Sequence, residues 1–134
     1  MKVTMTNSMD GKNYPKAIDN AVERMLVEAG IMVEGDAVML APVDTGRVKG
    51  SITYATNRKR TRVRGVAKPG DEVSTPMEDD TVYIGTNVEY AQHLEYGTVK
   101  MKAQPFMRPA FDNNKAEIMR RGLKEVHEGL KRGK

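Results

Sequence analysis

Residues 15–41 read PKAIDNAVERMLVEAGIMVEGDAVMLA and decide the fold. Apolar side chains recur along this stretch at steps of three or four residues, which is the period of an α-helix. Pro15 suits the first turn of a helix and Pro42 ends the pattern, so the stretch predicts one helix about 40 Å long at ~1.5 Å per residue. Gly30 and Gly35 leave a kink or a break in its middle as an alternative. A helix of this length needs other elements, or other subunits, to cover its apolar side.

The same period returns at the C-terminal end of the chain. Pro109 is predicted to begin a last helix, with Asp112 in its first turn and Lys131 in its last turn, as the helix dipole favours. Its predicted apolar positions are Phe111, Ile118, Met119, Leu123, Val126 and Leu130.

Short stretches outside these helices favour strands. Residues 51–56 and 81–86 carry β-branched and aromatic side chains and are predicted as strands. Residues 62–64 alternate charged and apolar side chains, so a third, exposed strand is possible there. Residues 1–13 are polar and have no clear period, which indicates a flexible arm or an edge segment.

The remaining segments read as turns and one short helix. Residues 42–50 combine Pro, Asp, Thr and Gly, which is typical of an ordered turn. Residues 88–95 predict a short helix, capped by Asn87 and ended by Gly97. Residues 98–104 are predicted to return as an extended piece.

This order of elements predicts an α+β fold. A small antiparallel sheet should pack against the long N-terminal helix and the C-terminal helix. The length suits a single domain over residues 1–134, with residues 1–13 flexible and residues 57–80 forming an extended arm or loop. Within 57–80 a basic run is followed by an acidic stretch, and we expect a charged hairpin or loop that reaches out from the body.

Composition excludes several classes of protein. Lys plus Arg is 22 and Asp plus Glu is 18, so the net charge is +4, which names no partner by itself. Cysteine is absent, which excludes disulfides, thiolate metal sites and cysteine nucleophiles. No run of about 18 apolar residues predicts a membrane span, and residues 1–11 do not resemble a signal peptide. With only two Phe, no Trp and ten Met, the core should be thin, which hints at burial by oligomerisation.

The chain offers few candidates for catalysis or metal binding. His93 and His127 each lack the second histidine that a zinc-binding helix needs. A pair of His93 with Glu95 is disfavoured, because residues two apart on a helix do not face each other. A P-loop is also missing from the sequence. Asp44-Thr45-Gly46 occurs in aspartic proteases, but those enzymes need two such aspartates, so a tight turn is the preferred interpretation.

Charged and aromatic side chains supply candidates for a contact surface. The basic run 58–64 could be a solvated hairpin, contact a neighbouring subunit or bind DNA phosphates. The first two are favoured, because the run has no aromatic residue for base stacking and an acidic stretch follows it. Phe106 and Phe111 fit a core corner before the last helix, whereas packing explains Arg108 between them less easily. Tyr96, beside a glutamate, fits either a plain surface or an interface.

Several short segments stand in an order that resembles a known family. They are APVDTGRVKGSI at 41–52, VYIGT at 82–86, EYA at 89–91, LEYGT at 94–98 and QPFMRPA at 104–110. Their order and spacing resemble the small neck and minor-tail proteins of long-tailed bacteriophages, the head–tail joining or tail-completion family. Val48 stands where a leucine is more usual, which is a mild departure from the pattern.

The resemblance implies a non-enzymatic structural protein of a phage or prophage, without cofactor or metal. Such proteins form rings, commonly of six subunits, between the capsid portal complex and the tail tube, and DNA passes through the ring. The expected partners are further copies of the chain, head–tail connector and tail-tube proteins, and genomic DNA without specific binding, but no membrane. The expected location is the neck or tail of the virion, after assembly in the host cytoplasm. The position in the neck stays open between tail completion, tail terminator and head–tail adaptor. The alternative function is a small basic nucleic-acid-binding module.

Two groups of residues follow from the pattern and the resemblance. The expected organisers of turns and helix ends are Asp44, Thr45, Gly46, Tyr90, Glu95, Gly97, Pro105 and Pro109. The candidate contacts with subunits or partners are Arg58, Arg60, Arg62, Arg64, Tyr96, Phe106 and Arg108. A ring that conducts DNA should have a neutral or acidic lumen, which would keep the basic run at subunit contacts.

Overall fold

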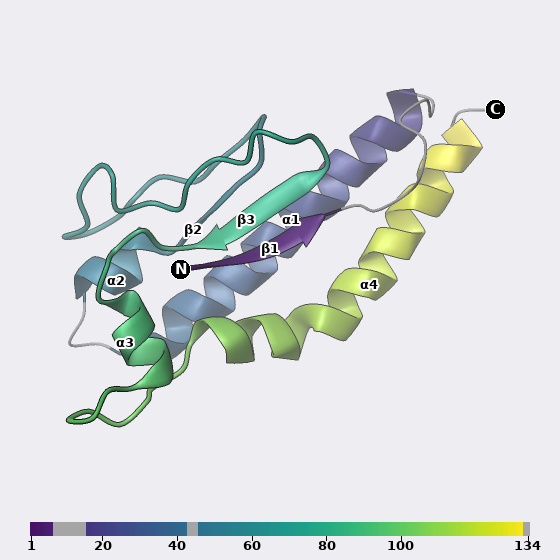
Figure 1. The fold of residues 1–134 in the computed structure, drawn as a ribbon. Coiled ribbons are helices and arrows are strands. Elements are labelled where there is room, and N and C mark those ends of the chain that lie inside the picture. The colour runs from purple at the N-terminus through teal and green to yellow at the C-terminus, as the bar shows by residue number, and fades with distance from the viewer. Residues whose placement is uncertain (7–15, 43–45, 133–134) are drawn as a thin grey trace.

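The structure, a computed structural model, describes residues 1–6, 16–42 and 46–132. The elements are β1 (Lys2–Thr6), α1 (Lys16–Leu40), α2 (Gly46–Ser51), β2 (Thr53–Ala55), β3 (Thr81–Gly85), α3 (Ala91–Tyr96) and α4 (Met107–Arg132). Figure 1 shows an antiparallel sheet of order β1-β3-β2 lying on α1, with α4 running beside α1. The predicted α+β class, with a small antiparallel sheet and two long helices, is confirmed.

The core lies between the sheet and α1, where Val33 and Ile84 are fully buried, and Phe106 closes it from the start of α4. β2 and β3 pack over α1, whereas β1 lies toward α4. The helix α1 continues unbroken through Gly30, so the predicted alternative of a break is not realised. Gly30 instead allows the ring of Tyr54 to lie directly on the helix, because a Cβ there would stand 2.7 Å from Tyr54 Cγ.

The helix ends differ from the prediction for local reasons. α4 begins at Met107, and Pro109 falls in its first turn, where helix N–H groups have no internal partner. α3 begins at Ala91 and is not capped by Asn87. The Asn87 amide donates instead to the Gly70 carbonyl at 3.0 Å, so it is engaged with a neighbouring loop.

The N-terminal segment contributes a strand to the sheet. Lys2–Thr6 pairs with β3 along its whole length and forms an edge strand, rather than a flexible arm. Residues 7–13 of the predicted arm lie outside the described residues. The strand considered for residues 62–64 does not form.

The predicted turn at 42–50 contains a helix. Gly46–Ser51 forms α2, because Val48 and Ser51 lie three residues apart and are both buried against the body. Residues 43–45 of that turn lie outside the described residues.

Candidate assembly surfaces

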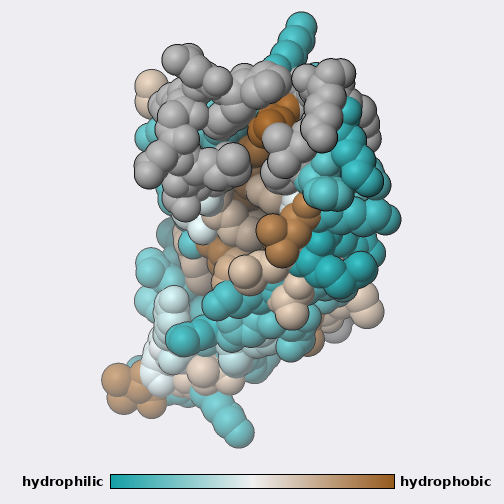
Figure 2. All heavy atoms as spheres, turned by 90° about the vertical axis from the view of Figure 1, so that its right-hand side faces the viewer, coloured by the Kyte–Doolittle hydropathy of each residue, from teal (hydrophilic) through white to brown (hydrophobic). Residues whose placement is uncertain are grey.

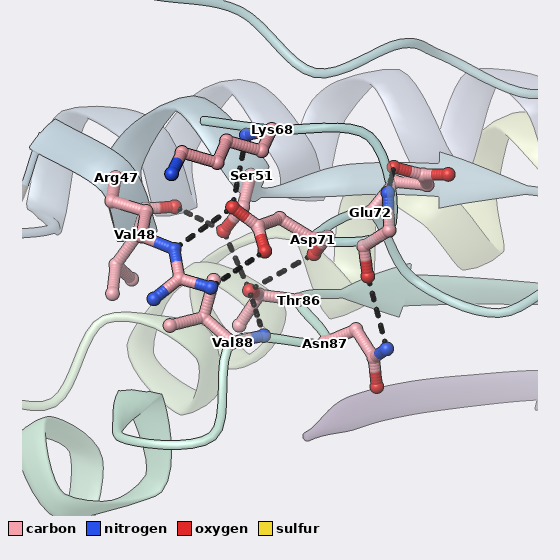
Figure 3. Close-up of polar contacts among 10 residues, drawn as sticks. Arg47, Val48, Ser51, Lys68, Asp71, Glu72, Thr86, Asn87 and Val88 are labelled. Atoms are coloured by element: carbon pink, nitrogen blue, oxygen red, sulfur yellow. Dashed lines mark hydrogen bonds and ion pairs between the residues drawn. The ribbon is translucent and has the colours of Figure 1, made fainter. Parts of the chain in front are cut away.

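A partly buried ion pair ties α2 to the loop that precedes β3. Arg47 donates from Nε to Asp71 Oδ2 at 3.0 Å and from Nη2 to Oδ1 at 2.9 Å, which is the paired geometry of a strong guanidinium–carboxylate contact. The backbone N–H of Lys68 also donates to Asp71 Oδ2, at 2.9 Å. Figure 3 shows Arg47 and Asp71 pointing toward each other between α2 and the loop.

A second layer of hydrogen bonds joins this pair to the end of β3. The hydroxyls of Ser51 and Thr86 lie 2.5 Å apart, and the N–H of Val88 donates to Thr86 Oγ1 at 3.0 Å. The N–H of Asn87 donates to the Asp71 carbonyl at 2.8 Å. We call Arg47, Ser51, Asp71 and Thr86 the clasp, and it fixes α2, the loop and β3 to one another (Figure 3).

The clasp makes stability sensitive to acid. The hydrogen bond from Arg47, and next that from the Lys68 N–H, lower the pKa of Asp71 to about 2. Because this pKa lies below that of an unfolded aspartate, about 4, the stabilisation is complete above about pH 4 and is lost as the pH falls toward 2. We expect the free energy of unfolding, from urea titrations, to fall more steeply over this range in the wild type than in Asp71→Asn.

A control variant assigns that acid sensitivity to the pair. Arg47→Gln keeps the carboxylate but removes its main partner, so its stability should also depend less on pH between 4 and 2. Identical pH slopes in the wild type and both variants would contradict a stabilising role for the clasp.

Glu95 caps the start of α4. Its side chain is buried, and its Oε1 accepts the N–H groups of Phe106 at 3.1 Å and Met107 at 2.9 Å. Its Oε2 accepts the N–H of Arg108 at 3.3 Å. A carboxylate at this end of a helix also meets the favourable sign of the helix dipole. Gly97, with a φ of 78°, ends α3 just before this contact.

The other expected organisers occupy different places. Tyr90 is half-buried and precedes α3, with the Arg47 guanidinium 5.9 Å from its ring centroid. Gly46 begins α2, and Pro105 is exposed before α4. Asp44 and Thr45 lie outside the described residues, so the structure places neither the loop organiser nor the protease-like aspartate.

The four arginines of the basic run divide into two pairs. Arg58 Nη2 lies 3.0 Å from Asp19 Oδ2, and Arg64 Nη1 lies 2.9 Å from Glu34 Oε1, so both are paired with α1. Arg60 and Arg62 are exposed, make no ion pair with any described residue, and line a pocket of about 240 Å³. Only this second pair is free to meet another molecule.

The charged segment 57–80 is a loop that lies along the body rather than reaching out from it. Arg64 donates from its N–H to the Gly50 carbonyl at 2.8 Å and from Nη2 to the Ile52 carbonyl at 2.9 Å. A Cβ at position 50 would stand 2.1 Å from the Arg64 carbonyl oxygen, so the two backbones are in direct contact. These bonds, the arginine pairs and the clasp hold the loop in place, which corrects the expectation of a projecting arm.

An apolar groove opens between β1, α1 and α4. It measures about 560 Å³ and is floored by Met25, Leu26 and Ala29 of α1. On its α4 side, Met119 is 62% exposed and Leu123 is 73% exposed. Figure 2 shows apolar side chains at the bottom of a hollow on this face of the molecule. Within the described residues, these side chains are therefore left open to water.

A hook, residues 97–105, projects from the molecule between α3 and α4, at the lower left of Figure 1. The N–H groups of Thr98 and Met101 donate to each other's carbonyls at 2.8 and 3.3 Å, which makes a tight turn with Val99 at its tip. Tyr96, just before the hook, is 71% exposed, and Arg108, just after it, is exposed and 4.0 Å from Asp112. Both side chains are accessible, as a contact role requires.

Phe106 is the exception among the candidate contacts. Its side chain is completely buried in the core, so in this fold it is a packing residue and not part of a surface. The described residues contain no group of three or more His, Asp or Glu side chains placed to hold a metal ion. None of the helices in the described ranges has an apolar stretch that would span a membrane.

Comparison with known protein families identifies the family of the chain. Residues 10–97, about two thirds of the chain, match a family model described as bacteriophage HK97-gp10-like tail components. The chain belongs to this family. The match confirms the resemblance to phage tail proteins that the motifs indicated, and it ends before most of the hook and α4. No curated protein and no solved structure matches the chain.

Sequence reasoning missed the clasp of this tail component. Arg47 directly follows Asp44-Thr45-Gly46, and Asp71 directly follows the Pro69-Gly70 turn, so both stand beside marked turns. Nothing in the sequence pairs them, because they are 24 positions apart and meet only once the loop returns to α2.

Proposed function

We propose that the chain is a ring-forming structural subunit at the head–tail interface of a long-tailed phage or prophage, where copies of it join or complete the tail. The observation that carries the proposal is membership of a phage tail-component family by a chain whose apolar groove is left open. Its work is assembly rather than catalysis.

The open groove supports self-assembly. Contiguous exposed apolar side chains mark surfaces that another molecule covers. Met119 and Leu123 lie one helical turn apart on α4 and face the groove together with Met25. Methionine-rich surfaces adapt to a partner's shape, which suits a subunit that completes its core on assembly.

The two unpaired arginines support a second contact. Arg60 and Arg62 present two guanidinium groups without a described partner, whereas Arg58 and Arg64 are satisfied within the chain. In the proposed ring, Arg60 and Arg62 contact carboxylates of a neighbouring copy or of a connector protein. They do not line the lumen, so DNA passes through without binding to them. Because half of the basic run is used internally, the alternative of a nucleic-acid-binding module loses much of its support.

The test is genetic and structural. In a phage that encodes this chain, removal of the gene should leave heads and tails unjoined in electron micrographs, and wild-type chain supplied in trans should restore joined particles. The double variant Arg60→Glu/Arg62→Glu should fold normally yet reduce joined particles by about tenfold or more, because opposed charges at an interface become like charges.

A variant with the same change in net charge serves as the control. Lys16→Glu/Lys115→Glu alters two other exposed cations and should restore joined particles as the wild type does. Normal particles without the gene would overturn the proposed function. Full rescue by Arg60→Glu/Arg62→Glu would remove those two arginines from the contact.

A further inference from the structure

The sheet covers α1 but stops short of α4. Adjacent strands lie about 4.8 Å apart and packed helices about 10 Å apart, so two helices side by side need about four strands to cover them. This sheet has three, and β1, its outermost strand, reaches only the near side of α4. The groove occupies the place beyond β1 where a fourth strand would lie, directly over Met119 and Leu123.

The outer edge of β1 is open for backbone pairing. The N-terminal amine of Met1 donates to the Thr86 carbonyl and the Thr86 N–H donates to the Met1 carbonyl, both at 3.0 Å, so residue 1 bonds toward β3. In an antiparallel ladder the direction alternates along the strand, so Lys2, Thr4 and Thr6 point their N–H and C=O groups away from β3. Among the described residues no strand takes up these groups.

The missing strand must be a single extended segment. A second copy could not pair its own sheet edge to edge with β1, because α4 extends past that edge and would meet the helices beneath the incoming sheet. A segment without a helix layer behind it meets no such obstacle. The occupant is therefore an arm or loop, which adds to an open sheet edge as extended peptides commonly do.

The hook has the sequence of a strand that this fold does not use. Residues 98–104 read TVKMKAQ, so apolar Val99, Met101 and Ala103 alternate strictly with polar side chains. In the structure these residues form no strand, and Val99 is fully exposed, at 104%. Such alternation is typical of a strand that is buried on one face and exposed on the other.

We propose that residues 98–104 of one copy add to the free edge of β1 of the next copy as a fourth strand, with Val99 and Met101 packed on Met119 and Leu123. This contact rests on the proposed ring and specifies how neighbouring copies join. The hook and the groove are made of different residues, so the contact joins two unlike surfaces and generates a ring or a filament.

Length and charge fit this pairing. Seven extended residues span about 23 Å at ~3.3 Å each, enough to run the whole length of β1. In an antiparallel register with Lys102 opposite Thr4 and Lys100 opposite Thr6, Gln104 faces Lys2, so no two lysines oppose each other. The pairing exchanges the two turn hydrogen bonds between Thr98 and Met101, and those from the N–H groups of Lys100 and Gln104 to Thr98 Oγ1 and the Leu94 carbonyl, for bonds to the new strand. Met101 exchanges its partly buried place against its own core for the neighbour's groove.

The test uses two full-length variants with complementary defects. Val99→Asp places a charge on the hook and leaves the groove unchanged, whereas Leu123→Asp places a charge in the groove and leaves the hook unchanged. Both positions are exposed, so both variants should fold, which far-UV circular dichroism and a melting curve would establish. By sedimentation velocity, each variant alone should self-associate at least about tenfold more weakly than the wild type, because an aspartate would be buried in the contact.

Mixing the two variants gives the decisive result. One intact hook and one intact groove remain, so the mixture should form a one-to-one complex that does not grow further. Met77→Asp, another fully exposed apolar side chain outside the proposed contact, is the control and should assemble as the wild type does.

The other outcomes separate this contact from the proposed function. A wild type that assembles while Val99→Asp assembles equally well would overturn the strand addition and leave the ring standing. Wild type and mixture that both stay monomeric at high concentration would also overturn the strand addition, whereas the place of the chain in the phage is decided by the gene-removal experiment.

Discussion

Replacement of Phe106 by alanine should lower the free energy of unfolding by about 3–5 kcal/mol, the usual cost of deleting a buried phenylalanine ring. The ring is completely buried where the start of α4 meets the sheet and α1. Its loss would leave a cavity in the core that the sheet, α1 and the start of α4 share. Urea unfolding followed by circular dichroism would measure the change.

A neighbouring aromatic side chain provides the contrast. Tyr96 lies ten positions earlier and is exposed, so Tyr96→Ala should change the free energy of unfolding by less than about 0.5 kcal/mol. The sequence placed both residues among candidate contacts but also fitted Phe106 to a core corner, and the burial of Phe106 confirms the core position. Equal stability of the two variants would show that the Phe106 ring is not held in the core.

The long helices were predictable because their signal is local and repeated. Over twenty-five residues α1 keeps an apolar side chain at every third or fourth position, and the twenty-six residues of α4 do much the same. The two main strands are likewise dense in β-branched and aromatic residues. The family resemblance came from ordered motifs that lie mostly in the loops and helix ends of the matched region.

The sequence left the segment of β1 open between a flexible arm and an edge segment because its signal is short. Lys2–Thr6 alternates polar and apolar side chains over only five residues, and its partner Thr81–Gly85 lies about eighty positions away. A stretch of that length gives no local reason to prefer strand over arm, since pairing and burial across the sheet decide it. Residues 98–104 show the reverse situation: their sequence alternates as a strand does, but in the structure they form no strand.

The division of the basic run could not be foreseen from the sequence. Arg58, Arg60, Arg62 and Arg64 are the same residue type in one short segment, yet only the first and last find carboxylates. Those carboxylates belong to Asp19 and Glu34 on α1, and their distance from the loop is a property of the folded chain. Side-chain partners across long separations in the sequence therefore set which arginines remain unpaired among the described residues.

Glu95→Ala should lower the free energy of unfolding by about 4 kcal/mol, because three N–H groups at the start of α4 lose a charged acceptor in a buried place. Glu95→Gln keeps one oxygen but turns an amide toward a donor, so we expect a loss of about 2 kcal/mol. Urea unfolding would measure both changes. Gln92→Ala, an exposed position on the same short helix, should stay within about 0.5 kcal/mol of the wild type.

The place along α4 where hydrogen exchange speeds up distinguishes loss of the cap from general destabilisation. Further along α4, Asn114 donates to Asp36 at 2.6 Å and Arg24 pairs with Glu125 at 3.1 Å, so the middle of the helix stays attached to α1 when its cap is removed. Hydrogen exchange in Glu95→Gln should therefore speed up first at the amides of residues 106–108, while amides near residue 118 keep wild-type protection. Uniform acceleration along α4 would contradict the capping role.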